Sequence, residues 1–164
     1  MNKKKALFVI GMDYKWEEKL YQTTNISPEN MLILRVYGPA ILAPYGDLMR
    51  TIILAVHQED IDEIFVVGTK DDRENTVDMQ NLVNRMYENE GLKSQIKVMD
   101  YLFKYSTPKF PKETIREWLE GDEIQESVQK SIQVIRKHPL VPPYVRVQGL
   151  LLNEKNEELV AVEV

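Results

Sequence analysis

Charged side chains follow three short apolar segments of the chain, and their types could support acid–base, metal or anion chemistry. Asp13 and Lys15 follow the apolar residues 6–10, and Arg35 lies near the end of the apolar residues 31–36. A third set follows the apolar residues 64–67 and consists of Lys70, Asp71, Asp72 and Arg73. Carboxylates act as acids, bases or ligands of hard cations, whereas lysine and arginine bind anions. The candidate catalytic residues are therefore Asp13, Lys15 and Asp72.

The nucleophile and metal-ligand inventory is otherwise short. The sequence contains no cysteine, which excludes a thiolate-bound metal and a cysteine nucleophile. His57 lies in an expected helix and His138 at the end of another, immediately before a proline. We interpret both histidines as structural rather than as ligands.

Mutual neutralisation is one interpretation of the charged groups. Asp72 would then pair with Lys15 or Arg35, because an unpaired buried carboxylate costs several kcal/mol. Alternatively, Asp13 and Asp72, with the Thr69 hydroxyl and waters, would bind Mg²⁺ or a similar cation. The neighbouring basic side chains compete for the same carboxylates and argue against that metal site.

Anion binding is the third interpretation. Lys15 and Arg35, with backbone N–H groups near Gly38 or Gly68, would hold bicarbonate, phosphate or a carboxylate. No glycine-rich phosphate loop accompanies these residues, so the sequence leaves all three interpretations open.

Short apolar runs separated by helical patterns predict the elements that position these residues. We expect buried strands at residues 6–10, 31–36 and 64–67, and a fourth at 96–99. We expect helices at 47–58 with Asp47 as N-cap, at 77–89 ending at Gly91, at 113–119 closed by Gly121, and from a cap at Asp122 to His138. The remaining expectations are a short helix opened by the loop at 13–22, an irregular aromatic segment at 100–112, and a hairpin of residues 145–152 and 159–164.

This alternation predicts one α/β domain spanning residues 1–164. A mostly parallel central sheet would lie between helices as a three-layer fold, with the hairpin at the C-terminal end. Ligands of such sheets bind outside the carboxyl ends of the strands. The segments to consider are therefore residues 11–15, 35–39 and 68–73.

Composition limits the partners. The chain has 21 basic and 26 acidic residues, a net charge of −5, which argues against nucleic acid as a partner. No apolar run is long enough to span a membrane, and the lack of cysteine agrees with a cytoplasmic location.

The same segments resemble motifs of the β-class carbonic anhydrases, above all the smaller bacterial members. That family's first strand leads into Cys-x-Asp-x-Arg, and here residues 6–10 lead into Gly11-Met12-Asp13-Tyr14-Lys15. Its second strand ends in an arginine followed at three residues by a glycine, like Arg35 and Gly38 here. Its third strand leads into His-x-x-Cys, and here residues 65–68 lead into Thr69-Lys70-Asp71-Asp72. Residues 122–149 resemble the family's penultimate helix, proline-rich elbow and following strand.

The resemblance implies a zinc site whose three ligands are missing. Family members bind zinc through those two cysteines and the histidine, and the positions here hold Gly11, Asp72 and Thr69. The metal lowers the pKa of bound water to about 7, so that hydroxide attacks carbon dioxide. We therefore expect neither zinc nor zinc-dependent hydration of carbon dioxide. The binding pocket implied by the motifs consists of Gly11, Asp13, Lys15, Arg35, Gly38, Thr69 and Asp72.

Two functions follow from this resemblance. The leading one is a non-catalytic carbonic anhydrase homologue that binds a protein partner or a small anion such as bicarbonate or phosphate. The alternative is a hydrolase or lyase of altered chemistry that uses Asp13 or Asp72, with a hard metal ion such as Mg²⁺ as an option. Because family members assemble from dimers, we also expect a homodimer.

Overall fold

The computed structural model describes residues 3–11, 17–37, 43–70, 73–108, 112–153 and 156–164, and the chain forms two compact units. The first comprises residues 1–70 and 123–164, and the second residues 71–122. The single domain over residues 1–164 stays a prediction. None of the helices within the described ranges is both long and apolar enough to cross a bilayer.

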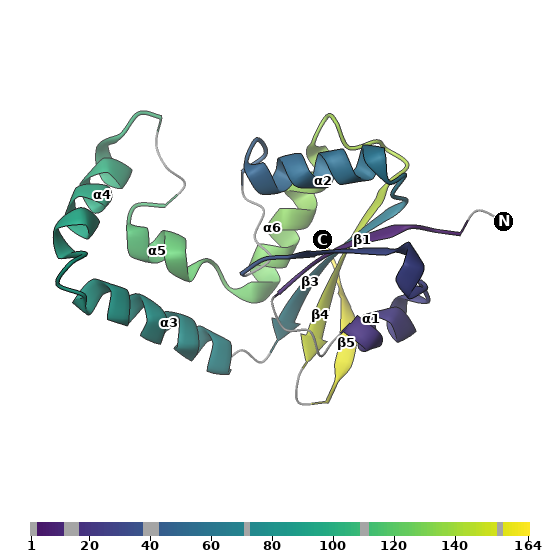
Figure 1. Cartoon of the computed structure of the whole chain (residues 1–164), viewed down its shortest axis with the longest axis horizontal. Coiled ribbons are helices and arrows are strands. Elements are labelled where there is room, and N and C mark those ends of the chain that lie inside the picture. Colours follow the sequence, from purple (N-terminus) through teal and green to yellow (C-terminus); the bar gives the residue numbers. More distant parts are fainter. Residues whose placement is uncertain (1–2, 12–16, 38–42, 71–72, 109–111, 154–155) are drawn as a thin grey trace. The chain divides into compact units, whose positions relative to one another are not determined.

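The first unit contains a five-stranded sheet in the order β2-β1-β3-β4-β5 (Figure 1). Its strands are β1 (Ala6–Ile10), β2 (Met31–Arg35), β3 (Glu63–Lys70), β4 (Arg146–Asn153) and β5 (Glu158–Val162). The first four strands run parallel, and β5 pairs antiparallel with β4. The predicted mostly parallel sheet with a C-terminal hairpin is therefore confirmed.

Helices cover both faces of this sheet (Figure 1). They are α1 (Glu17–Thr24), α2 (Asp47–Gln58) and α6 (Ile124–Lys137), with a short 3₁₀ helix at Pro28–Asn30. Strand side chains alternate between faces, so Leu7 and Val9 pack in one core cluster with residues of α2 and α6. Phe8 and Ile10 pack in the other cluster with Leu20 of α1. The result is the predicted three-layer arrangement.

Two glycines allow α6 to lie close to the sheet. A Cβ atom on Gly149 would lie 2.5 Å from Cδ1 of Ile132, and one on Gly68 would lie 2.8 Å from Cγ1 of Ile124. Both glycines are buried on neighbouring strands, β4 and β3. Any side chain at these positions would therefore push α6 away from the sheet.

The second unit is helical. It contains α3 (Arg73–Glu88), α4 (Lys93–Tyr105) and α5 (Ile115–Glu120). The Asp100 carboxylate of α4 accepts the backbone N–H of Ile115 at 2.8 Å, and the Arg116 guanidinium lies 4.5 Å from the centre of the Tyr87 ring of α3. These contacts tie α5 to both longer helices.

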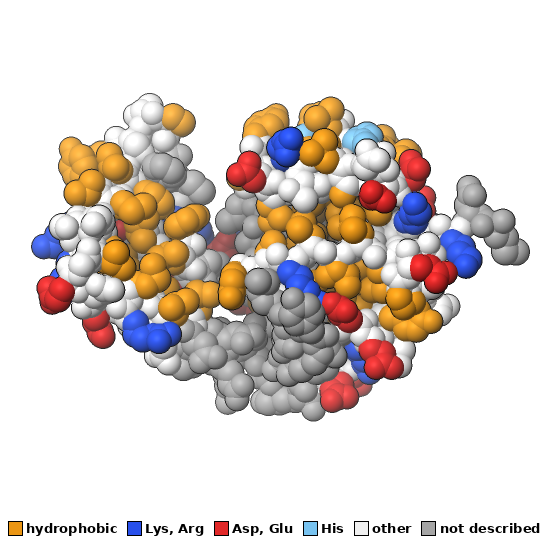
Figure 2. All heavy atoms as spheres, in the orientation of Figure 1, with side chains coloured by type: hydrophobic (Ala, Val, Ile, Leu, Met, Phe, Trp, Pro, Cys, Tyr) orange, Lys and Arg blue, Asp and Glu red, His pale blue; other side chains and the backbone are white. Residues whose placement is uncertain are grey.

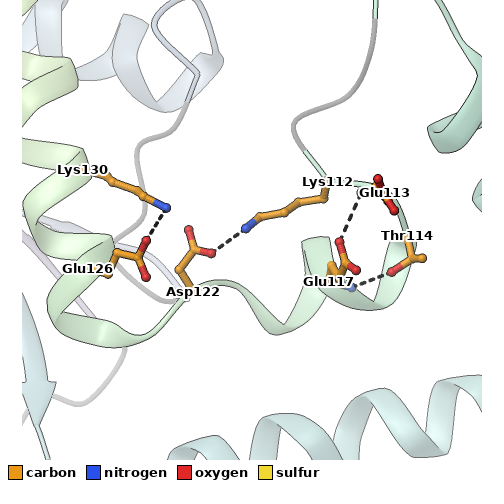
Figure 3. Close-up of polar contacts among 7 residues, drawn as sticks. All are labelled: Lys112, Glu113, Thr114, Glu117, Asp122, Glu126 and Lys130. Atoms are coloured by element: carbon orange, nitrogen blue, oxygen red, sulfur yellow. Dashed lines mark hydrogen bonds and ion pairs between the residues drawn. The ribbon is translucent and has the colours of Figure 1, made fainter.

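Side-chain caps define the start of α5 (Figure 3). The Thr114 hydroxyl accepts the N–H of Glu117 at 3.1 Å, and the Glu117 carboxylate accepts the N–H of Glu113 at 3.2 Å. This reciprocal pattern resembles a capping box. In the same unit, Lys112 and Asp122 form an ion pair of 2.5 Å that joins the two ends of the α5 segment.

Five sequence-based expectations were wrong. Residues 96–99 form no strand but lie within α4, which also continues through the expected irregular segment to Tyr105. The N-cap of α2 is Gly46, and Asp47 is its first residue. The N-cap of α6 is Glu123 rather than Asp122, with the Glu123 carboxylate accepting the N–H of Glu126 at 3.1 Å. Helix α3 ends at Glu88, before Gly91.

Candidate functional site

The carboxyl ends of the three parallel strands β1, β2 and β3 lie on the same side of the sheet. The sequence places the candidate site there. Ile10 of β1 is the register partner of Arg35 at the end of β2, and Val9 is the partner of Val66 of β3. Gly11 follows Val9 by two residues and Thr69 follows Val66 by three. These two residues thus lie at the same end of adjacent strands, offset by about one residue step of 3.3 Å.

Gly11 leaves room at the end of β1. A Cβ atom built on Gly11 would have no heavy atom of the described residues within 4 Å, apart from its own chain neighbours, and its φ lies outside the left-handed region. Neither packing nor backbone conformation therefore requires glycine at this position. The Gly11 carbonyl accepts a hydrogen bond of 3.0 Å from Nη1 of Arg35.

Arg35 is held at the strand ends by more than this carbonyl. Its Nη2 forms an ion pair with Oε1 of Glu17, the first residue of α1. The Arg35 side chain is 14% exposed and the Glu17 side chain 42% exposed, so the guanidinium lies largely out of solvent beside a carboxylate. The guanidinium has a neutralising partner here that differs from Asp72, the partner considered from the sequence.

Thr69 is the second-last residue of β3, in a half-buried position, and its register partner on β4 is Leu152. The preceding residue, Gly68, is fully covered by the side chains of Ile124 and Val128 of α6. The packing of α6 therefore accounts for a glycine at position 68 without any bound anion. The prediction that Gly68 helps to form an anion site gains no support from this contact.

The remaining predicted site residues lie outside the described part of the chain. They are Asp13, Lys15, Gly38 and Asp72. The structure brings together Gly11 and Arg35, places Thr69 on the adjacent strand end, and adds Glu17. Sequence reasoning missed Glu17, whose only signal was its position in the first turn of a predicted short helix.

Comparison with known proteins gives this strand-end site its context. No protein-family model matches the chain. The "Putative carbonic anhydrase-like protein YbcF" of Bacillus subtilis is 43% identical over 152 residues, which cover 93% of this chain and 83% of the relative. The chain belongs to the β-carbonic anhydrase family.

Solved structures agree with this family on the fold. A carbonic anhydrase from Streptococcus mutans aligns with a TM-score of 0.66 at 17% identity, over 98% of this chain and 82% of its own. An apo carbon disulfide hydrolase aligns with a TM-score of 0.61 at 19% identity, over 99% and 80% of the two chains. A tetrameric β-carbonic anhydrase of Sordaria macrospora aligns with a TM-score of 0.57 at 13% identity, over 100% and 83%.

The residues of this family member do not fit a zinc ion. Of the ligand positions implied by the motifs, Gly11 has no side chain and Thr69 offers only a neutral hydroxyl. Within the described ranges, no group of three or more histidine, aspartate or glutamate side chains is arranged to hold a metal.

The two histidines have structural contacts instead. His57 Nε2, at the end of α2, lies 2.8 Å from the carbonyl oxygen of Leu140. His138 is the C-cap of α6, and its Nδ1 accepts the N–H of Leu140 at 3.2 Å. Both contacts fix the elbow between α6 and β4, on the amino side of that strand.

Proposed function

We propose that this chain is a β-carbonic anhydrase homologue that has lost zinc-dependent hydration of carbon dioxide and acts by binding. The observation that supports the proposal most is the residue set at the strand ends, where Gly11 and Thr69 stand at positions for which the resemblance implies a cysteine and a histidine. Arg35 and Glu17 carry compensating charges at the strand ends, so this buried guanidinium needs no bound ion to balance it.

The proposed ligands are a protein partner or a small anion such as bicarbonate or phosphate. At the strand ends an anion would have to compete with the Glu17 carboxylate for Arg35. Because that carboxylate is 42% exposed, it could move toward solvent and expose the guanidinium. We place the protein in the cytoplasm, in keeping with its lack of cysteine.

Metal content and turnover together test the loss of zinc chemistry. Purified protein dialysed against zinc should contain well under one zinc per chain by elemental analysis, and should hydrate carbon dioxide no faster than buffer in a stopped-flow assay. Stoichiometric zinc together with hydration above the buffer rate would refute the proposal.

A reconstituted variant provides the matched control. Gly11→Cys, Thr69→His and Asp72→Cys together restore the ligand types that the resemblance implies, and the open space at Gly11 accepts the first side chain. We expect this triple variant to bind zinc stoichiometrically. If it remains metal-free while folded, the three positions are not those of a lost zinc site.

An enzyme of altered chemistry is the second candidate. The carbon disulfide hydrolase among the solved structures indicates that this fold serves a reaction other than hydration of carbon dioxide. In that case Asp13→Asn and Asp72→Asn would each abolish a turnover found by substrate screening, while the far-ultraviolet circular dichroism spectrum stays unchanged. A turnover that survives both changes would exclude these carboxylates as its acid or base.

A homodimer is the proposed assembly, and an apolar stripe on α4 supports it. Val98, Tyr101, Leu102 and Tyr105 follow the i, i+3, i+4, i+7 spacing of one helix face, yet are 58, 64, 50 and 62% exposed. Figure 2 shows hydrophobic side chains gathered on the visible surface of this unit. The four side chains expose about 500 Å², a large part of the roughly 800 Å² that each partner contributes to a standard interface.

A single charge in the stripe tests this assembly. Leu102→Glu should convert a dimer into a monomer in light scattering after size exclusion. Gln80→Glu adds the same charge at an exposed position of α3 outside the stripe and should leave the mass unchanged. A wild-type protein that is monomeric at all concentrations, or a dimer indifferent to Leu102→Glu, would contradict this use of the stripe.

A further inference from the structure

A second candidate binding site lies where α6 ends and β4 begins. A groove of about 520 Å³ is lined there by Arg136 at the end of α6, by Val141, Pro142 and Pro143 of the elbow, and by Arg146 and Gln148 of β4. Its volume lies within the range of small-molecule sites. Because Arg146 is the first residue of β4, the groove lies at the amino end of this strand, away from the strand ends that hold Gly11 and Arg35.

Arg136 is fixed in this groove by two hydrogen bonds to one carbonyl. Its Nε and Nη2 donate to the oxygen of Val147 at 3.1 and 2.6 Å. This fork leaves the remaining N–H groups of the planar guanidinium free of that carbonyl. A side chain whose orientation is already set loses little entropy when it binds a ligand.

Arg146 carries a charge that its neighbours do not neutralise. Glu63, the register partner of Arg146 on β3, pairs with Lys4 at 3.2 Å, and Asp62, just before β3, accepts the N–H of Lys5 at 3.0 Å. No carboxylate within the described ranges lies at ion-pair distance from Arg146 or from Arg136. In a chain of net charge −5, two such arginines on one groove form a local positive site.

The apolar wall of the groove is rigid. Pro142 and Pro143 have fixed φ angles and no backbone N–H, so they present hydrocarbon without an unpaired donor. The elbow is further held by the hydrogen bond from the N–H of Val145 to the carbonyl of Pro142, at 3.0 Å, and by the contact of His57 with Leu140. A fixed apolar wall facing fixed cations suits a ligand with both an apolar and an anionic part.

We propose that this groove binds a small organic anion. A carboxylate or phosphate group would accept hydrogen bonds from Arg136 and Arg146, and the apolar part of the ligand would lie against Val141, Pro142 and Pro143. The site is separate from the strand-end pocket and does not depend on the fate of the zinc ligands.

Titration of ¹⁵N-labelled full-length protein with phenyl phosphate tests the proposal. The amide resonances of residues 145–148 should shift saturably, and inorganic phosphate, which lacks the apolar part, should bind at least threefold more weakly. Benzoate distinguishes a carboxylate site from a phosphate site by its relative affinity. No saturable shift at these residues with either phenyl phosphate or benzoate would overturn the proposal.

Charge-matched variants show whether anion binding depends on this groove or only on the net charge of the protein. Arg146→Gln removes the charge of an exposed side chain that lines the groove, and should weaken phenyl phosphate binding about tenfold or more. Arg50→Gln removes the same charge from an exposed position of α2 and should change the affinity by less than twofold. Arg146→Lys keeps the charge but loses the fork, and should retain intermediate affinity. Equal weakening by Arg146→Gln and Arg50→Gln would reduce the effect to net charge and refute a groove site.

Discussion

Substitution of three glycines by alanine distinguishes Gly149 and Gly68, on which α6 packs closely, from Gly11, which has open space at the end of β1. In Gly149→Ala the new methyl group would lie 2.5 Å from Cδ1 of Ile132, 2.8 Å from Cγ1 of Val128 and 3.1 Å from Cβ of Val162. These atoms belong to α6 and β5 and must all shift. Overpacking of this kind costs about 1–3 kcal/mol, and we expect about 3 kcal/mol here. Gly68→Ala, with two contacts below 3.0 Å, should cost about 2 kcal/mol.

Gly11→Ala should behave in the opposite way. Its methyl group meets no atom of the described part of the chain within 4 Å, and the φ of Gly11 lies outside the left-handed region. The alanine therefore lowers the entropy of the unfolded chain without strain in the folded one, which stabilises by about 0.4–1 kcal/mol. Urea unfolding followed by far-ultraviolet circular dichroism gives all three free energies. A stabilising Gly149→Ala, or a Gly11→Ala as harmful as the other two, would refute the reasoning.

A double variant shows whether the penalty at Gly149 arises from the named contact. Ile132→Val removes the atom nearest to the new methyl group and by itself costs about 0.5–1.5 kcal/mol. If the steric account is right, Gly149→Ala combined with Ile132→Val should be at least 1 kcal/mol more stable than the sum of the single effects predicts. Strict additivity would show that the penalty has another origin.

Three further changes test separate features. Gly121→Ala should lower the free energy of unfolding by about 1–3 kcal/mol in a urea titration, although its Cβ meets no described neighbour, because Gly121 has a φ of 72° and a ψ of −171°, a combination essentially restricted to glycine. Glu17→Gln should cost about 1 kcal/mol by removing the charge beside Arg35, and the loss should shrink in 1 M salt. Burial, with the Asp100 carboxylate, raises the pKa of Tyr87 above its ordinary value of 10.0, so an absorbance titration should lose its high-pH component in Tyr87→Phe. Since the folded pKa is the higher one, the stabilising effect of the neutral phenol is present below about pH 10 and is lost as the pH rises, and Tyr87→Phe should lose less stability over that range.

The strands of the sheet were predictable because each is short, apolar and bounded by polar turns. Residues 96–99 show the limit of that reasoning, since four residues with isoleucine and valine fit a strand as well as a helix turn. A longer stretch of sequence indicates the helix, because Ile96, Asp100 and Phe103 recur at helical intervals. In the structure, Asp100 and Phe103 contact α5. The rings of Tyr101 and Tyr105, centred 4.9 Å apart, form an i, i+4 pair on the exposed face.

Part of the candidate site was predictable for a topological reason. Parallel strands bring Gly11, Arg35 and Thr69 to one edge whatever their exact contacts, so their strand ends locate them. The partner of Arg35 could not be found this way. A glutamate in the first turn of a helix is equally explained by the helix dipole, and only the packing of α1 brings Glu17 to the guanidinium.

The strand-end residues of the candidate site are ones that the hydrophobic core does not use. Gly11, Arg35 and Thr69 belong to neither hydrophobic cluster, whereas the residues just before them on the strands, among them Val9, Ile10 and Val67, are buried within the clusters. A bound metal would add its binding free energy to folding, so its loss lowers stability without dismantling a packed layer. Gly68 and Gly149 have the opposite constraint, because α6 rests on them. The scaffold can therefore persist under selection for folding alone, and strand-end residues are free to take up a different role.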